Sequence, residues 1–250
     1  MDVKKHTCPI CDNTCLFLDT VDFNKSCEEV NGKYLELSGI PISYMFCNSC
    51  NFCFSPEIYT WQLQDFEKNI YNSEYIIIDP DYIEARPQAN TENLISMFPH
   101  FPKPLRHLDY GGGDGLLAKL LCRSGWNSTS YDPFVNKGVC IKQIGTFDLI
   151  TAFEVFEHVP DAHVLMSNLR TLLAPGGVII FSTLLSDNQI RPNQKLTWWY
   201  AAPRNGHISL FSKKSLQIIT KQYGLNFGSF SNAFHISWVT VPQWASHLIR

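Results

Sequence analysis

Two pairs of cysteines with the spacing C-x-x-C lie near the N-terminus, Cys8 with Cys11 and Cys47 with Cys50. Such a pair places two thiolates on one tight turn, and two turns together supply the four ligands of a closed tetrahedral zinc site. A closed site has no open coordination position, so we expect a structural zinc rather than a catalytic one. Cys15 and Cys53 lie close enough in the sequence to replace a neighbouring ligand.

A glycine-rich stretch runs from Asp109 to Gly115, between a predicted strand (106–110) and a predicted helix (114–124). Glycines let the backbone approach a ligand, and the start of a helix offers unpaired N–H groups. Asp109 at the end of its strand would attract an ammonium group and repel a pyrophosphate. Asp132 ends the next strand, where a carboxylate can accept both hydroxyls of a ribose. The stretch Gly113–Ala118 also satisfies G-x-G-x-x-A, so the glycines alone leave a dinucleotide site open.

Glu154, Glu157 and His158 follow a third predicted strand (147–152) at positions i, i+3 and i+4. That spacing can place all three on one face of a helical turn. His158 is the first candidate for a general base, with Glu154 beside it, because histidine ordinarily titrates near neutral pH. A second candidate, His207, lies in an aromatic loop (198–212). A purely structural histidine remains the alternative.

The elements that must position these residues alternate from residue 105 onward between strands and helices. This alternation predicts a mostly parallel sheet with helices on both faces. Before it, the sequence predicts helices over 61–69, capped by Thr60, and over 88–98, in a proline-containing connector. We therefore expect three parts: a zinc-binding module (1–56), a helical connector or cofactor lid (57–104) and the sheet domain (105–250).

Three stretches together resemble class I S-adenosylmethionine-dependent methyltransferases: the D-x-G-x-G-x-G loop at Asp109, the segment 147–160 (FDLITAFEVFEHVP) and the segment 172–181 (LLAPGGVIIF). The resemblance implies a Rossmann-like α/β sheet of strand order 3-2-1-4-5-7-6. Strand 3 is expected to be reduced or absent, since few residues separate Asp132 from Phe147. It also implies a set of cofactor-binding residues, which are Asp109, Gly111, Gly113, Gly115, Asp132, Phe153 and Tyr71.

Two of these assignments depend on details of the resemblance. The acid or amide that usually reads the adenine has no clear counterpart here, so backbone groups or Phe153 are expected there. Tyr71 matches a tyrosine-rich stretch that closes over the cofactor in sugar-tailoring relatives with a cysteine module.

A divalent cation is a further hypothesis for the histidine region. Two carboxylates with imidazoles suit a cation that binds vicinal hydroxyls. Ubiquinone-type O-methyltransferases and small-RNA 3′-end methyltransferases show a similar E-x-x-E-H followed by a distant histidine. The cation would lie among Glu154, Glu157, His158 and His207.

The charge composition limits the classes of molecule that the protein is expected to bind. The 250 residues carry 20 Lys and Arg against 23 Asp and Glu, a net charge of −3, which argues against a phosphate-tracking surface and hence against nucleic acid. No secretory leader or membrane-spanning run is evident, so we expect a cytoplasmic protein acting on a small molecule.

The predicted function is S-adenosylmethionine-dependent methyl transfer to a small hydroxylated metabolite, with a nucleotide-linked or glycan-precursor sugar as first candidate. An RNA methyltransferase with a zinc ribbon, an NAD(P)-dependent oxidoreductase and a non-catalytic cofactor-binding protein remain alternatives. The sequence does not define the oligomeric state.

Overall fold

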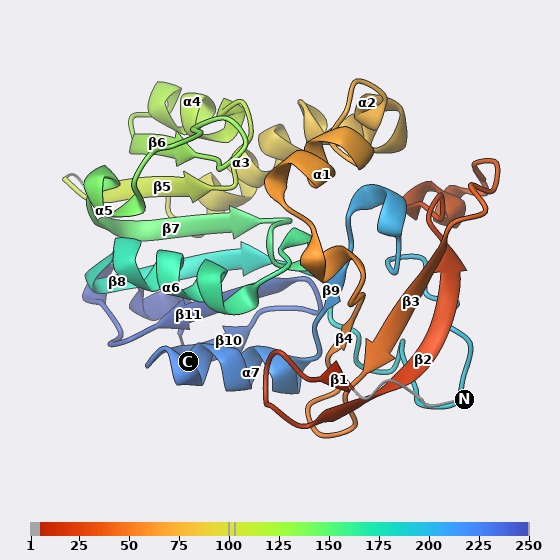
Figure 1. Ribbon diagram of the computed structural model, residues 1–250. Helices are drawn as coiled ribbons and strands as arrows, with labels where there is room; N and C mark the ends of the chain where they lie inside the picture. The colour runs from red at the N-terminus through yellow and green to blue at the C-terminus, as the bar shows by residue number, and fades with distance from the viewer. Residues whose placement is uncertain (1–5, 100, 103, 250) are drawn as a thin grey trace. The chain divides into compact units, whose positions relative to one another are not determined.

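Two sheets organise the chain in the computed structural model, which describes residues 6–99, 101–102 and 104–249. Each sheet belongs to one of two units (Figure 1). The glycine-loop unit comprises residues 81–155, 164–183 and 220–250. The cysteine unit comprises residues 1–80, 156–163 and 184–219. The chain passes between the units several times.

The sheet of the glycine-loop unit has the order β10-β11-β8-β7-β5-β6. Strands β6, β5, β7 and β8 run parallel, whereas β11 pairs antiparallel with β8 and β10 antiparallel with β11. The strands are β5 (Arg106–Tyr110), β6 (Asn127–Tyr131), β7 (Phe147–Phe153), β8 (Leu173–Ser182), β10 (Asn226–Ser229) and β11 (Phe234–Trp238).

This order confirms the predicted topology with its strand 3 missing. The full seven-stranded form is not present in the described residues: between β6 and β7 they form only the short helix α5 (Ile141–Ile144). Because a helix–strand–helix needs more chain than this connection supplies, β6 becomes the edge strand of the sheet.

Helices cover both faces of this sheet. Alternate residues of β7 and β8, including Leu149 and Val178, pack in one cluster with Leu94 of α3 (Ala85–Met97) and Leu117 of α4 (Leu116–Arg123). Helix α6 (Ala162–Leu172) lies across the opposite face (Figure 1). Burying an apolar stripe of each helix against the sheet is the main contribution to this fold.

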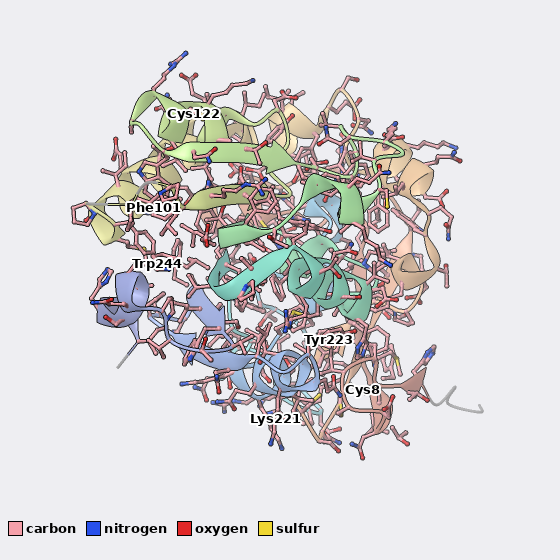
Figure 2. The ribbon with its side chains drawn as sticks, turned by 90° about the vertical axis from the view of Figure 1, so that its left-hand side faces the viewer. Cys8, Phe101, Cys122, Lys221, Tyr223 and Trp244 are labelled. Atoms are coloured by element: carbon pink, nitrogen blue, oxygen red, sulfur yellow. The ribbon has the colours of Figure 1, made fainter. Side chains whose placement is uncertain are left out.

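An aromatic group packs against the rim of that cluster. Phe101 stacks on Trp126 with ring centroids 4.0 Å apart and meets Trp244 edge-on at 5.8 Å. Figure 2 labels Phe101 and Trp244, which come from segments far apart in the sequence. Offset-stacked and edge-to-face pairs of this kind stabilise by about 1 kcal/mol each beyond their burial.

The sheet of the cysteine unit is antiparallel, with the order β1-β2-β3-β4-β9. Its strands are β1 (His6–Thr7), β2 (Thr14–Asp22), β3 (Pro41–Phe46), β4 (Cys53–Phe54) and β9 (Ser209–Leu210). Strand β9 joins from the segment that follows β8. The segment 184–219, assigned from sequence to the sheet domain, therefore folds with the N-terminal residues. The division into a zinc-binding module (1–56), a connector or lid (57–104) and a sheet domain (105–250) stays a prediction.

The connector contains α1 (Leu63–Asn69) and α2 (Tyr75–Ile78), and α7 (Lys213–Gln222) precedes β10. Helix α1 begins two residues later than predicted, and its N-cap is Gln62 rather than Thr60. The Gln62 N–H donates to the Asp65 carboxylate at 2.9 Å, whereas the Thr60 hydroxyl donates to the carbonyl of Glu57. Helix α3 begins three residues before the predicted Gln88.

Short 3-10 turns complete the described chain, at Cys27–Asn31, Ile58–Thr60, Pro80–Tyr82, Phe156–His158, Pro203–Asn205 and Gln243–Leu248. Among the helices of the described residues, none has the length and apolarity needed to cross a bilayer.

Candidate functional site

The glycine loop connects β5 to α4 in the glycine-loop unit, as predicted. Gly111, Gly113 and Gly115 all have positive φ, at 76°, 52° and 74°. A Cβ at Gly111 would lie 2.5 Å from the Val155 side chain, so this position has no room for a larger residue. A Cβ at Gly113 would meet nothing within 4 Å, which leaves the backbone there open to a ligand.

Asp109 is the penultimate residue of β5, just before this loop, and the residue is 4% exposed. Oδ1 accepts a hydrogen bond from the Thr151 hydroxyl at 2.9 Å, and a Cβ on Gly112 would collide with Oδ2. Burial raises the pKa of Asp109 to about 7; the Thr151 hydrogen bond lowers it and the nearby Asp132 charge raises it. A buried carboxyl of this kind suits a cationic ligand group, which would restore its ionised form.

Asp132 follows β6 on the other side of the loop. Oδ2 accepts the Gly113 N–H at 3.1 Å, and Oδ1 accepts the Phe134 N–H at 2.8 Å. Its own N–H donates to the Asn136 side chain. These bonds to main-chain groups fix the carboxylate beside Gly113, so the structure brings Asp109, Asp132 and the glycines together within one unit.

Phe153 and Glu154 lie at the end of β7. Phe153 is 9% exposed and packs on Phe234 with ring centroids 5.2 Å apart. Glu154 has a positive φ of 53°, its N–H donates to the Ser182 hydroxyl, and that hydroxyl donates to Glu154 Oε1 at 2.9 Å. A non-glycine residue in this backbone region carries strain, which is common at functional sites.

The two candidate histidines meet in the cysteine unit. The His158 and His207 rings lie 4.8 Å apart at 67°. His207 Nδ1 lies 2.9 Å from the carbonyl oxygen of Tyr200. A carbonyl only accepts, so Nδ1 carries the proton in neutral His207 and Nε2 keeps a lone pair.

Residues 70–71 and Gly206 surround this histidine pair. The Tyr71 ring lies 6.2 Å from His158 and 5.1 Å from Tyr75. Gly206 has φ 87°, and a Cβ there would lie 3.0 Å from His158 Nδ1 and 3.4 Å from the Tyr71 hydroxyl. Tyr71, assigned from sequence to cofactor binding, thus contacts a residue assigned to catalysis.

Glu157 lies at the base of the same cluster and is fully buried. Its carboxylate accepts a hydrogen bond from the Tyr200 hydroxyl. Glu157, His158 and His207 each offer a ligand atom, and these atoms lie within 4.8 Å of one another. Glu154, the fourth residue predicted for a cation, belongs to the other unit and is bonded to Ser182.

Several residues that hold His207 in place were not predicted from the sequence. The Tyr44 hydroxyl donates to the His207 carbonyl at 2.7 Å. The Lys25 ammonium donates to the carbonyls of Trp198 and Ala201 at 2.9 Å each, and burial lowers its pKa. The N–H of Cys27 donates to the Asn205 side chain at 2.9 Å. No sequence signal marks these contacts, because each joins residues more than 160 positions apart.

The four cysteines of the C-x-x-C pairs also meet in the cysteine unit. Cys8 Sγ lies 3.6 Å from Cys50 Sγ, Cys11 Sγ lies 3.5 Å from Cys47 Sγ, and all four atoms lie within 4.8 Å of one another. Sulfurs at about 2.3 Å from a tetrahedral zinc are about 3.8 Å apart, whereas a disulfide would hold them at about 2.05 Å. The spacing therefore fits a zinc site.

The two cysteine turns have the same backbone geometry. In one, the Asp12 N–H donates to the Cys8 carbonyl at 3.0 Å, and in the other the Asn51 N–H donates to the Cys47 carbonyl at 2.7 Å. Asp12 and Asn51 both have φ 59°. Cys53 is absent from this four-sulfur group. The pKa of Cys8 is lowered chiefly by its hydrogen bond with Cys15 and, second, by its hydrogen bond with Cys50.

An open α/β sheet with a glycine-rich loop and two acids after its first two parallel strands defines a nucleoside-cofactor-binding class of protein. The particular family follows from comparison with known proteins. The chain belongs to the methyltransferase domain family, whose model matches residues 82–228. This confirms the predicted class I methyltransferase fold and family.

Curated relatives include ubiquinone biosynthesis O-methyltransferases. The one from Colwellia psychrerythraea is 31% identical over 100 residues, covering 31% of this chain and 41% of the relative. The one from Xanthomonas axonopodis is 32% identical over 106 residues, covering 33% and 44%. The match thus spans less than half the length of these relatives.

Solved structures that resemble this chain in part include an O-methyltransferase family protein from Burkholderia thailandensis. It is 14% identical at a TM-score of 0.48, over 66% of this chain and 58% of that one. Magnesium protoporphyrin IX methyltransferase from Synechocystis, with bound SAH, is 15% identical at a TM-score of 0.43. That match covers 72% of this chain and 95% of the other.

Proposed function

We propose that this protein transfers the methyl group of S-adenosylmethionine to a hydroxyl of a small metabolite. The observation that carries the proposal is the glycine loop with Asp109 on one side and Asp132 on the other. It receives support from the family match and from relatives named O-methyltransferases.

The residues present fit this cofactor. Asp109 is a buried anion that would meet the methionine ammonium, and it would repel the pyrophosphate of a dinucleotide. Asp132 has its carboxylate fixed by main-chain N–H groups and would accept the ribose hydroxyls. The open backbone at Gly113 would approach the ligand, and Phe153 at the end of β7 would contact the adenine.

The chemistry left to the protein is alignment and removal of one proton. The acceptor oxygen attacks the methyl carbon, the carbon–sulfur bond breaks, and S-adenosylhomocysteine leaves with the sulfur electron pair. We assign removal of the hydroxyl proton to His158, with His207 orienting the acceptor through its Nε2 lone pair. Glu154 holds the backbone at the end of β7, four residues before His158.

The acceptor class is the finer part of the proposal. Sugars linked to a nucleotide or destined for a glycan are the first class, because the His158, His207 and Tyr71 side chains near one another can bind hydroxyl groups. Hydroxylated aromatics are the second class, favoured by the names of the curated relatives. Both present a hydroxyl whose proton must leave, so the role of His158 is the same for both.

A structural zinc at Cys8, Cys11, Cys47 and Cys50 is part of the proposal, since the four thiols fit a tetrahedral ion. A divalent cation at Glu157, His158 and His207 is a variant of the mechanism. In that variant a cation would hold vicinal hydroxyls of the acceptor, and activity would vanish after chelation and return with Mg²⁺ or Mn²⁺. With His158 as a base alone, a chelator too weak to remove the zinc leaves activity unchanged.

The experiment incubates the zinc-loaded protein with methyl-labelled S-adenosylmethionine and a panel of sugars and phenols. We expect label in one acceptor with one S-adenosylhomocysteine per product. His158→Gln should lower kcat at least a hundredfold with the cofactor Kd unchanged. His247→Gln, at an exposed site in the other unit, is the matched control and should match wild type.

Three outcomes would contradict the proposal. Binding of NADP but not of S-adenosylmethionine would favour an oxidoreductase. Methylation of RNA but of no small molecule would favour the zinc-ribbon RNA enzyme. Tight cofactor binding without turnover of any acceptor would favour a non-catalytic binding protein.

A further inference from the structure

A row of four polar side chains crosses three neighbouring strands of the glycine-loop unit. His107 Nδ1 lies 2.6 Å from the Ser128 hydroxyl, and His107 Nε2 lies 3.0 Å from the Thr151 hydroxyl. The Thr151 hydroxyl in turn donates to Asp109 Oδ1 at 2.9 Å. The strand register pairs His107 with Ser128 and Asp109 with Thr151, so all four lie on one face of the sheet.

The direction of each bond in this row is fixed by its last member. An ionised Asp109 only accepts hydrogen bonds, so the Thr151 hydroxyl donates its single proton to Asp109. Thr151 must then accept from His107, which places the imidazole proton on Nε2. His107 Nδ1 therefore has the lone pair and accepts from the Ser128 hydroxyl. The row is a one-way chain of donors from Ser128 to Asp109.

The interior of the unit keeps His107 neutral over the pH range in which Asp109 titrates. His107 is fully buried and meets Trp126 edge-on at 5.7 Å. Burial lowers the pKa of His107 to about 3, so the ring stays neutral at any pH near physiological. Ser128, at the other end, is half-buried and lines an open groove of about 540 Å³ beside α4.

The ionisation of Asp109 is sensitive to this row of hydrogen bonds, because its pKa of about 7 leaves the carboxyl nearly balanced between its ionised and protonated forms. Burial raises its pKa to about 7, the Thr151 hydrogen bond lowers it, and the Asp132 charge raises it. Among the described residues, the titratable groups that face it are His107 on its own strand and Asp132 beyond β6. The neighbouring strands present only the hydroxyls of Thr151 and Ser130.

We infer that His107 is a positioning residue for Asp109, the carboxylate proposed to bind the cofactor. By donating to Thr151, it commits the Thr151 hydroxyl to Asp109 and so holds Asp109 ionised for a cationic ligand group. The inference rests on the proposed function for the identity of that group. The ionisation of Asp109 itself is measurable without any ligand.

The first arm of the test follows the Asp109 carboxyl by carbon-13 NMR titration in the ligand-free, zinc-loaded protein. Thr151→Val should raise the titration midpoint by about one pH unit, because a hydrogen bond to the charged form is lost. His107→Leu should raise it by about half a unit, because Thr151 loses the donor that orients and polarises it. His107→Gln keeps a donor toward Thr151 and should return the midpoint to that of wild type.

The second arm measures the Kd of S-adenosylmethionine between pH 6 and pH 9. At pH 7, Thr151→Val should bind about fivefold more weakly, and the deficit should shrink by pH 9, where Asp109 is ionised in both proteins. Thermal unfolding of each variant checks that it is folded, and Ser128→Ala, at the half-buried end, serves as the mildest break in the chain.

The outcomes separate the inference from the proposed function. Midpoints that move as expected in a protein that binds no S-adenosylmethionine would sustain the inference and sink the proposed function. The inference would be overturned if the Asp109 titration midpoint did not move, or if His107→Gln behaved like His107→Leu. It would also be overturned if the variants lost affinity for S-adenosylmethionine equally at every pH. Each of those results would leave the proposed function standing.

Discussion

The two units build their candidate sites in different ways. In the glycine-loop unit, Asp109, Asp132 and Phe153 each lie within one residue of the end of a strand, and neighbouring main-chain groups and hydroxyls fix the two carboxylates. In the cysteine unit, His158 and His207 come from distant segments. Tyr200 and Tyr44 bind His207, and Lys25 binds the carbonyl of the nearby Ala201. The first arrangement follows from local sequence, whereas the second depends on long-range packing. The two units should therefore respond differently to the same kinds of substitution.

The largest expected effect is in the cysteine unit. Cys47→Ser removes one of the four proposed zinc ligands, and structural zinc sites contribute on the order of 10 kcal/mol to the folding of small metal-binding modules. We expect loss of zinc and a fall in the midpoint of thermal unfolding of more than 10 °C. Cys140→Ser, at an exposed thiol outside the cluster, is the matched control. Zinc content by atomic absorption that is equal in both variants would contradict the site.

A pair of glycine substitutions tests the loop of the other unit. Gly111→Ala introduces a Cβ that collides with Val155 at a positive φ, and we expect a loss of about 3 kcal/mol in unfolding free energy. Gly113→Ala has the same sign of φ but open space, and should lose only about 1 kcal/mol. Denaturant unfolding measures both. Equal losses would mean that the close approach at Gly111 has no energetic weight.

The third prediction concerns pH and stability. The pKa of Asp109 is raised to about 7 in the folded state, so the folded protein binds more protons than the unfolded chain between pH 4 and pH 7. Stability from this group is therefore lost as pH rises through that window. Asp109→Asn removes this ionisable group and with it the fall in unfolding free energy. The substitution should therefore be more stabilising at pH 8 than at pH 5, by about 2 kcal/mol. Denaturant unfolding at the two pH values gives the difference, and a difference of zero or of opposite sign would contradict a raised pKa.

Much of the glycine-loop unit could be predicted from the sequence because its signals are local. The loop at Gly111–Gly115, the acid at Asp132 and the missing strand before Phe147 can each be read from a few consecutive residues. The grouping of Cys8, Cys11, Cys47 and Cys50 was also predictable, since each C-x-x-C is a complete turn. The arrangement around His207 was not, because strand β9 pairs with β4 across about 155 residues of chain.

The position of Glu154 shows the limit of spacing arguments. Its i, i+3, i+4 relation to Glu157 and His158 predicted one helical face, but a positive φ at Glu154 turns its side chain to Ser182. The three residues that meet are instead Glu157, His158 and His207. The polar row from Ser128 to Asp109 was also missed, since His107 and Thr151 each read from sequence as ordinary strand residues.

The central claim is that the glycine loop binds S-adenosylmethionine, and calorimetric titration tests it most directly. The zinc-loaded wild type should bind with micromolar affinity, and Asp132→Ala should weaken binding roughly a hundredfold, because two hydrogen bonds to a charged group are lost. Asp187→Ala, at an exposed carboxylate of the other unit, should bind like wild type. No binding by folded, zinc-loaded protein, or equal binding by wild type and Asp132→Ala, would contradict the account.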